Sequence, residues 1–522
     1  MAHYSSSASS VPSDSNSRIL LFRWTVLGLL FLVALAIRLF RLDTPPIDFH
    51  PMRQYHSAFI ARSFYYQMQE NIPEWQREVA AMSAQREASL EPPILEAIAA
   101  LSYRVAGGEH LWIPRLVSLL CWLIAGIFVY AIALKLGSFE GAVFSVAFFL
   151  LLPFTVEASR SFQPEPLMMM FMAIGIYFII LNAESPSLQR LIMSAVFSSL
   201  AILLKPTSVF FVYGAYISML LYRNKDWRQF FDRDSLLFFT LSFLPALLFY
   251  GYGIFIAGYM RWKLQTSFIP QLLFDFDFWD GWLKRVRIVM GFTAFLGGFL
   301  SVLLFQKGWQ KFLLLGLWAS YFAYVFTFTY HVHTHDYYHV PLILIVALSL
   351  SSFATLISRQ IRSESRGWFW QFLFWSTLFA AFVLSAGTSI QAKRKVTNVE
   401  GEIQIASTIG KIVNHSTQTI VLDEFDGMSL MYHGQFSGVS WPHTYDIIDG
   451  QLWNEPELNA QQRFHELNKN NSMEYFIVTD LSELTEQADL NDFLRSRFVI
   501  LAENEDYLIF KLPNDLISGS QN

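Results

Sequence analysis

The chain has 522 residues, of which 53% are hydrophobic, 17% aromatic and only 15% charged. Because a soluble domain carries about a quarter charged residues, the composition excludes an ordinary soluble globule and indicates a polytopic α-helical membrane protein. The net charge of −5 is too small and too dispersed to suggest nucleic acid as a partner. The single cysteine, Cys121, excludes an intramolecular disulfide framework and a cysteine-based zinc site.

Residues 1–18 are rich in serine, lack apolar periodicity and are predicted to form a disordered tail. A bilayer core requires roughly 17–25 apolar residues per helix. By that measure eleven transmembrane spans are predicted, near 19–37, 111–134, 139–157, 165–182, 190–204, 206–222, 235–258, 287–305, 312–329, 340–357 and 368–388. The fourteen residues 93–106 follow Pro92 and are predicted to lie on the membrane surface as an amphipathic helix; if they span, the count is twelve.

Lysine and arginine are distributed in a way that favours eleven spans and a cytoplasmic N-terminus. In this arrangement the short outer loops contain only Arg160 and Lys205, although Lys393, Arg394 and Lys395 also lie outside. The segments that then share the outer face are the loop 38–110, the tip 158–165, the Lys205 turn, the loop 259–286, the tip 330–339 and the region after residue 390.

The composition changes after residue 390 to charged and asparagine-rich sequence. Four short β-like runs occur there, near 419–422, 474–478, 498–501 and 507–510, with helical patterns between them. Three regions are therefore predicted: the tail, a transmembrane domain 19–390 that includes the loop 38–110, and a small α/β extramembrane domain 391–522. The last region shows no phosphate loop, metal-spaced cluster or catalytic triad.

A carboxylate, an arginine and two histidines follow the first span within ten residues: Asp48, His50, Arg53 and His56. Charged side chains at the membrane surface have a high free-energy cost of burial, and they are taken as functional by default. Asp48 is a candidate general base or electrostatic anchor, and Arg53 a candidate phosphate ligand. Equally, a long wet loop can carry such charges while the histidines cap helices.

Two further charged residues lie at predicted outer turns. Glu165 begins a helix after Pro164, where the ordinary preference for acids at helix N-termini explains it, unless it converges with Asp48 on one site. Lys205 separates two short spans, where it either extends to the headgroups or holds a lipid phosphate. Arg104 lies in the last turn of the predicted surface helix and Arg115 follows it; both are interpreted as structural.

The segment 330–339 contains four histidines and an aspartate between two spans. The His-x-His spacing permits metal ligation, and its tyrosines suit sugar stacking. There is no helical pair of the HExxH type, so a divalent metal is possible but is not predicted.

Several of these motifs occur in a characteristic order: Asp48-x-His50-x-x-Arg53-Gln54, Glu91-Pro92-Pro93, Arg115-Leu-Val-Ser, Ser159-Arg160-x-x-x-Pro164-Glu165, Leu203-Leu204-Lys205-Pro206 and Asp336-Tyr337-Tyr338-His339-Val340-Pro341. Over residues 19–360 this order resembles the C-type (GT-C) glycosyltransferases of the ArnT, protein mannosyltransferase and RgtA/B/C/D-like group.

The resemblance implies inverting transfer of a sugar from a polyprenyl-phosphate donor to a lipid, glycan or protein acceptor on the periplasmic or lumenal face. It makes Asp48 the catalytic carboxylate and Glu165 a second acid, with Glu in place of the commoner Asp. We do not infer a bound metal from the resemblance. Glu91 occupies a position where several relatives have His or Asp. The candidate substrate-binding residues are His50, Arg53, Gln54, His56, Glu91, Arg160, Lys205, His335, Asp336, Tyr337, Tyr338 and His339.

Two other functions are compatible with a multi-pass protein that carries charges at one face. A transporter or flippase for a lipid-linked sugar would place charges near the bilayer midplane and often shows repeated halves, neither of which is seen. An oligosaccharide polymerase or ligase usually has its charged loop late in the chain, whereas here the long loop follows the first span. We expect a multi-pass protein of a bacterial inner membrane that contacts membrane lipids, with its site on the periplasmic face. Neither the sugar nor the acceptor can be read from the residues.

Overall fold

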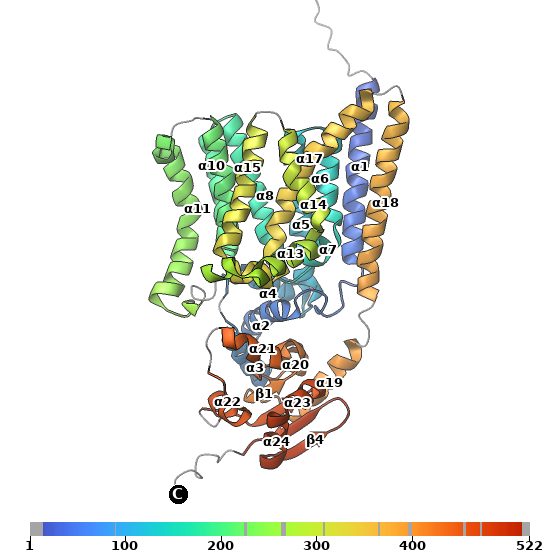
Figure 1. The fold of residues 1–522 in the computed structure, drawn as a ribbon. Coiled ribbons are helices and arrows are strands. Elements are labelled where there is room, and N and C mark those ends of the chain that lie inside the picture. Colours follow the sequence, from blue (N-terminus) through green and yellow to red (C-terminus); the bar gives the residue numbers. More distant parts are fainter. Residues whose placement is uncertain are drawn as a thin grey trace, which may run out of the picture. The chain divides into compact units, whose positions relative to one another are not determined.

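The computed structural model describes residues 14–88, 90–223, 227–262, 268–305, 308–363, 366–394, 399–452, 456–469 and 472–513. The chain forms two compact units, each assembled from separate segments (Figure 1). Unit 1 consists of Met1–Phe40, Leu119–Ser159 and Glu165–Gln391. Unit 2 consists of Arg41–Ser118, Arg160–Pro164 and Ala392–Asn522. Of the predicted tail, 1–13 lie outside the described residues and 14–18 already belong to the first helix.

Unit 1 is a bundle of helices. Its elements are α1 (Asp14–Leu39), α5 (Trp112–Leu136, which starts within unit 2), α6 (Phe139–Leu151), α7 (Pro153–Ala158), α8 (Glu165–Glu184), α9 (Leu188–Leu204), α10 (Ser208–Arg223), η1 (Trp227–Phe231), α11 (Arg233–Gly251), η2 (Tyr252–Ile256), η3 (Pro270–Phe274), α13 (Phe276–Met290), α14 (Phe292–Ser301), η4 (Val302–Leu304), α15 (Trp309–Thr327), α16 (Thr329–Thr334), η5 (Asp336–His339), α17 (Val340–Ser363) and α18 (Gly367–Arg394).

Among the described residues, six helices are long and apolar enough to cross a membrane, or up to seven if one bent pair is a single span. They correspond to the predicted spans that begin near 19, 111, 165, 235, 340 and 368. Three shorter apolar helices, α6, α9 and α10, occupy other predicted spans. The protein is therefore a multi-pass membrane protein, and the count of eleven spans stays a prediction.

Two predicted spans are interrupted. The span predicted at 287–305 is wrong in its first part, because α13 and α14 meet at 89°. The break is Gly291, whose φ of 77° and ψ of 151° suit glycine and few other residues. The span predicted at 139–157 is divided between α6 and α7 at Pro153, which has no amide hydrogen to continue a helix.

Small residues allow α10 and α15 to pack closely. Gly214 and Ser218 on α10 face Gly316 and Ser320 on α15, four residues apart on each helix. A Cβ added at Gly316 would lie 2.7 Å from the Gly214 carbonyl oxygen and 2.5 Å from the Ser218 Cβ. Reciprocally, a Cβ at Gly214 would lie 2.9 Å from the Gly316 carbonyl oxygen. Such small-residue faces bring membrane helices together by direct backbone approach.

Unit 2 combines helices of the first loop with an α/β region. Its elements are α2 (Pro51–Gln67), α3 (Glu74–Arg86), α4 (Ile94–Ala106), α19 (Val399–Ile412), β1 (Thr419–Leu422), η6 (Glu424–Gly427), α20 (Met428–Gly434), β2 (Gly438–Ser440), α21 (Thr444–Leu452), α22 (Ala460–Leu467), β3 (Tyr475–Val478), α23 (Leu481–Glu486), α24 (Ala488–Arg497), β4 (Val499–Glu503) and β5 (Leu508–Lys511). The sheet order is β2-β1-β3-β5-β4, with β2, β1 and β3 parallel and β5 antiparallel to both neighbours.

The two faces of the sheet are covered by different partners. Along β1, Ile420 and Leu422 join a core with residues of α22 and α24. The alternate residue Val421 joins a second core with α19, α20 and the loop helices α2 and α4. Because both faces are buried, the sequences of the central strands are continuous apolar runs. The loop 38–110, expected to belong with the transmembrane domain, therefore supplies a layer of the C-terminal region instead.

Charged and aromatic contacts strengthen this layer. Arg62 of α2 donates through Nε to both carboxylate oxygens of Glu109, at 2.9 and 3.0 Å, and through Nη1 to the Tyr432 carbonyl at 2.7 Å. Its guanidinium lies 3.5 Å from the centre of the Tyr432 ring. The Tyr55 hydroxyl lies 2.9 Å from Nε2 of His433. The first loop and the C-terminal region are thus tied by buried polar contacts as well as by apolar ones.

We predict that Gly316→Ala lowers the melting temperature of the purified protein by several degrees. The new methyl group meets backbone and Cβ atoms of α10, and overpacking of this kind costs about 1–3 kcal/mol. Gly297→Ala is the matched control, because its Cβ would be no closer than 3.7 Å to any neighbour. Equal melting temperatures for the two variants in a thermal-shift assay would contradict the close approach of α10 and α15.

Candidate functional site

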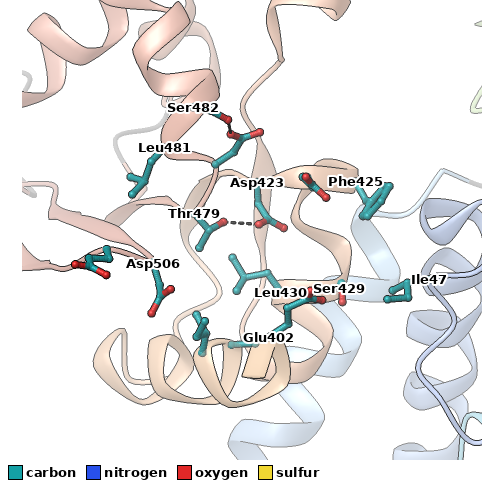
Figure 2. Close-up of a pocket in the computed structure, with 15 residues that line it drawn as sticks. Ile47, Glu402, Asp423, Phe425, Ser429, Leu430, Thr479, Leu481, Ser482 and Asp506 are labelled. Atoms are coloured by element: carbon teal, nitrogen blue, oxygen red, sulfur yellow. Dashed lines mark hydrogen bonds between the residues drawn. The ribbon is translucent and has the colours of Figure 1, made fainter. Parts of the chain in front are cut away.

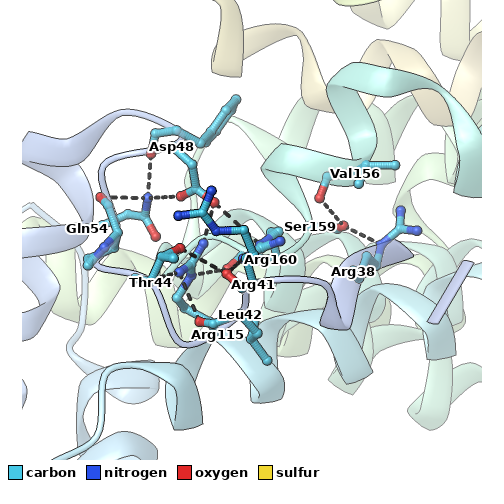
Figure 3. Close-up of polar contacts among 12 residues, drawn as sticks. Arg38, Arg41, Leu42, Thr44, Asp48, Gln54, Arg115, Val156, Ser159 and Arg160 are labelled. Atoms are coloured by element: carbon cyan, nitrogen blue, oxygen red, sulfur yellow. Dashed lines mark hydrogen bonds and ion pairs between the residues drawn. The ribbon is translucent and has the colours of Figure 1, made fainter. Parts of the chain in front are cut away.

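Asp48 is held between two buried arginines (Figure 3). Its Oδ2 forms an ion pair with Nη2 of Arg115 and lies 3.4 Å from Nε of Arg160. The exposed fractions of these side chains are 0% for Arg115, 1% for Arg160 and 10% for Asp48. A buried carboxylate needs such partners, because an uncompensated charge is very costly to remove from water.

Arg115 also organises the backbone around Asp48. From the first turn of α5, its Nη1 donates to the carbonyl oxygens of Leu42 at 3.1 Å and Thr44 at 2.6 Å. Its Nε donates to the carbonyl oxygen of Arg160 at 3.2 Å. The planar fork of a guanidinium allows one side chain to make all these bonds. Arg115 therefore connects the loop after the first span with the tip 160–164, in keeping with the structural role that we predicted, and it also pairs with Asp48.

Gln54 makes a second connection between the same segments. Its Nε2 donates to the carbonyl oxygens of Phe49 at 2.7 Å and Pro46 at 3.2 Å, and lies 3.5 Å from Oδ1 of Asp48. Its Oε1 accepts from the amide of Phe162 at 2.9 Å. Gln54 is fully buried, so it positions the Asp48 loop rather than facing solvent.

The other predicted residues of this loop pair with acids. Nη2 of Arg53 lies 3.2 Å from both oxygens of Glu91, and Nδ1 of His56 lies 2.7 Å from Oε2 of Glu87. His50 has a left-handed backbone, with φ of 45°, and its side chain makes no capping bond to α2. His56 lies inside α2, so neither histidine caps this helix with its side chain.

A second buried cluster belongs to unit 1. Glu165 at the start of α8 forms an ion pair with Nζ of Lys205, and their side chains are 3% and 8% exposed. The ammonium also lies 5.1 Å from the ring centre of Tyr337 and 5.0 Å from that of Tyr338. Glu165, Lys205 and segment 336–338 therefore meet within this unit. The Lys205 ammonium is paired inside the protein instead of extending to the headgroups.

The four histidines of 331–339 have local contacts, and the ring of His331 stacks on that of Tyr338 with centres 4.7 Å apart. Nδ1 of His333 lies 2.9 Å from the Thr329 carbonyl oxygen, and Nδ1 of His335 lies 2.6 Å from the Thr334 hydroxyl. The buried His339 lies between the Tyr321 hydroxyl, at 2.9 Å, and the Val332 carbonyl oxygen, at 2.8 Å. Within the described ranges, neither these histidines nor Asp336 form a group of three or more that could hold a metal.

Unit 2 contains a cavity of about 690 Å³ at the carboxyl ends of β1 and β3 (Figure 2). The chain leaves β1 towards β2 and leaves β3 towards the opposite edge, so the cavity occupies a topological switch point, where open α/β sheets bind ligands. Ile47, the residue before Asp48, is part of the lining. The lining also includes six carboxylates and no lysine or arginine: Glu402, Asp423, Glu424, Asp480, Glu505 and Asp506.

The residues predicted to share one outer-face site fall into two clusters: Asp48, Gln54 and Arg160 lie together in unit 2, and Glu165, Lys205, Tyr337 and Tyr338 in unit 1. Their roles stay predictions. Sequence reasoning missed the pairing of Arg115 with Asp48, the partner Glu87 and the acidic cavity. An arginine in the first turn of a 25-residue apolar helix was a signal that could have identified Arg115. The cavity acids come from segments far apart in the chain, so no local pattern marks them.

Part of the chain is similar to a known protein family. Residues 90–250 match the family model described as dolichyl-phosphate-mannose-protein mannosyltransferase. No curated protein matches the chain in sequence.

Solved structures share the fold at low identity. ArnT from Cupriavidus metallidurans, in a crystal structure bound to undecaprenyl phosphate, has 13% identity and a TM-score of 0.57, covering 94% of this chain and 98% of that one. Its apo form gives 14% identity, the same TM-score and coverages of 95% and 98%. The Archaeoglobus fulgidus oligosaccharyltransferase in complex with Zn and sulfate has 11% identity and a TM-score of 0.54, over 87% of this chain and 68% of that one.

The matched family model belongs to one of the groups that the ordered motifs resemble, and it spans 90–250, about a third of the chain. The solved structures share the overall fold with this multi-pass membrane protein.

Proposed function

We propose that the protein transfers a sugar, with inversion, from a polyprenyl-phosphate donor to a lipid, glycan or protein acceptor, with Asp48 as the general base. The observation that carries the proposal is the buried Arg115–Asp48–Arg160 cluster. A carboxylate fixed in one orientation by two guanidinium groups is preorganised, which is what a catalytic group requires.

The chemistry needs one carboxylate. The acceptor oxygen attacks the anomeric carbon, the bond from that carbon to the phosphate oxygen breaks, and the phosphate leaves with the bonding electrons. The acceptor proton passes to Asp48, for which we propose Oδ1, since both arginines bind Oδ2. Inversion in a single displacement requires no covalent sugar–enzyme intermediate, so no second carboxylate has to act as a nucleophile.

The donor phosphate needs cations that hold its charge as it leaves. We propose Arg160 for this role in unit 2, since its guanidinium already lies beside Asp48. Separately, we propose that Lys205 of unit 1, positioned by Glu165 and by the rings of Tyr337 and Tyr338, binds the phosphate of a membrane lipid. Glu165 then acts by orienting Lys205 and not as a base. His50, Arg53, His56, Glu91, His335, Asp336 and His339 remain candidates for donor or acceptor contacts.

We propose the acidic cavity as the acceptor site. Its volume of about 690 Å³ falls in the range of small-molecule sites, and Ile47 links its wall to Asp48 through one peptide bond. Carboxylates accept hydrogen bonds from hydroxyl and ammonium groups, so an acceptor group rich in these donors suits the lining. We further propose that the cavity and Asp48 lie on the periplasmic side of a bacterial inner membrane.

We predict that Asp48→Asn reduces sugar transfer at least 100-fold, within the range expected for loss of a general base. Asp43→Asn is the matched control, because Asp43 lies in the same loop but is exposed. The measurement is mass spectrometry of glycans and glycolipids from cells that lack the protein and are complemented with each variant. Wild-type product levels in the Asp48 variant, at equal expression, would rule out Asp48 as the base.

We predict that a cysteine at the exposed position Glu70 reacts with a membrane-impermeant maleimide in intact cells. The single native cysteine, Cys121, is buried and should stay unlabelled. Ser185→Cys, in a predicted cytoplasmic turn and also exposed, should react only after permeabilisation. The reverse pattern for the two positions would overturn the proposed orientation.

The burial of the Asp423 carboxyl can be tested through the pH dependence of stability. Burial raises the pKa of this cavity carboxyl from 3.8 to about 6. A raised pKa contributes stability that is present below about pH 4 and is lost as the pH rises through about 6. We predict that wild type loses stability relative to Asp423→Asn over this interval, by about 3 kcal/mol at most. Melting curves between pH 4 and 8 measure this, with the exposed Asp492→Asn as the control; parallel curves for all three proteins would show that the Asp423 charge is not buried.

A further inference from the structure

The carboxyl edge of the sheet holds a group of side chains that the proposed reaction does not use. The strands β1, β2 and β3 are parallel, so they all end at this edge. Asp426 follows β1, while His443 and Asp446 follow β2. One potential ligand atom from each of these three residues lies within 4.8 Å of the other two.

His443 is the informative member of this group. The residue is 5% exposed, and its Nδ1 is a buried atom with no hydrogen-bond partner among the residues that the structure describes. Nδ1 lies 3.9 Å from Oδ2 of Asp446, which is too long for a hydrogen bond. A buried polar atom without a partner is costly, so its orientation towards two carboxylates requires an explanation.

A third carboxylate faces the opposite side of the same ring. Nε2 of His443 lies 3.7 Å from Oδ2 of Asp480, which is also too long for a hydrogen bond. Metal binding through Nδ1 requires the proton on Nε2, and a carboxylate on that side stabilises such a ring when the two groups come within hydrogen-bond distance.

We propose that Asp426, His443 and Asp446 bind a divalent transition-metal ion. Ligands at about 2.0–2.2 Å from a tetrahedral ion lie about 3.3–3.6 Å apart. The Nδ1–Oδ2 separation is 3.9 Å and all three ligand atoms lie within 4.8 Å, so binding requires the side chains to close by about 1 Å or less at most contacts. Imidazole with carboxylates suits Zn²⁺ or Mn²⁺, whereas Ca²⁺ and Mg²⁺ prefer oxygen ligands alone. Three protein ligands leave coordination positions open.

Neighbouring groups hold the ligands in place. The backbone amide of His443 donates to Oδ2 of Asp446 at 3.1 Å, and the Ser440 hydroxyl donates to Oδ1 of Asp426 at 3.3 Å. The ring of Tyr445 stacks on that of His443, with centres 5.4 Å apart. These contacts fix the ligand-bearing loops relative to β2.

The ion would act on the acidic cavity. Asp480 lines the cavity and also lies behind His443, while Phe425, another lining residue, precedes Asp426. Binding would order the loops after β1 and β2 and counter part of the negative charge at this edge. The site is separate from Asp48 and does not rest on the proposed glycosyl transfer, so its test is a binding measurement.

The experiment uses the full-length protein in detergent after treatment with a chelator. Titration with Co²⁺, read by visible absorption, and with Zn²⁺, read by elemental analysis after dialysis, should give one bound ion per chain. His443→Gln and Asp446→Ala should each weaken binding at least tenfold. His465→Gln and Asp492→Asn, at exposed positions of the same domain, should bind like wild type.

Asp446 is 41% exposed, so its replacement leaves folding intact even if the His443 variant is destabilised. Zn²⁺ should also raise the melting temperature of wild type but not that of Asp446→Ala. Absence of a bound ion in wild type, or equal affinity of wild type and both ligand variants, would overturn the proposal.

Discussion

The buried pair of Asp48 and Arg115 is the contact on which the region around the first loop depends. Residues 40–50 form neither helix nor strand, so their backbone carbonyl groups need partners from elsewhere. Arg115, Arg160 and Gln54 supply those partners while holding the Asp48 carboxylate. A single network thus supplies hydrogen-bond partners to an irregular backbone and holds the carboxylate that we propose as the base.

Buried charges in the helical unit also need partners within the protein. Lys205 ends α9 and Glu165 begins α8, and each would be costly to bury alone. The ion pair compensates both charges, and the rings of Tyr337 and Tyr338 in segment 336–338 add contacts to the ammonium group, at one end of the bundle. Between the charged ends, close approach of α10 and α15 relies on glycine and serine, since lipid offers helices no hydrophobic gain from association.

The C-terminal sheet explains how the first loop acquires its structure. Both faces of β1 and β3 are apolar, and one of them needs α2 and α4 as part of its cover. The parallel half of the sheet then directs the loops after β1, β2 and β3 to one edge, where the acidic cavity and the His443 group lie. Strand direction and order therefore bring the cavity carboxylates and the His443 group to one edge of the sheet. No sequence motif marks this arrangement.

The sequence by itself determined the membrane class, most helix positions and all four of the β-like runs, because apolar runs are properties of neighbouring residues. Local charge density also marked the Asp48 segment as the candidate site. Only the tertiary structure decided that Arg115 holds Asp48 across 67 positions, that Tyr55 meets His433 across 378, and that the first loop covers the C-terminal sheet. Gly291 was visible in the sequence, yet the right-angle break there depends on how α13 and α14 pack. Ion pairs and layers join distant segments, and local periodicity does not record such contacts.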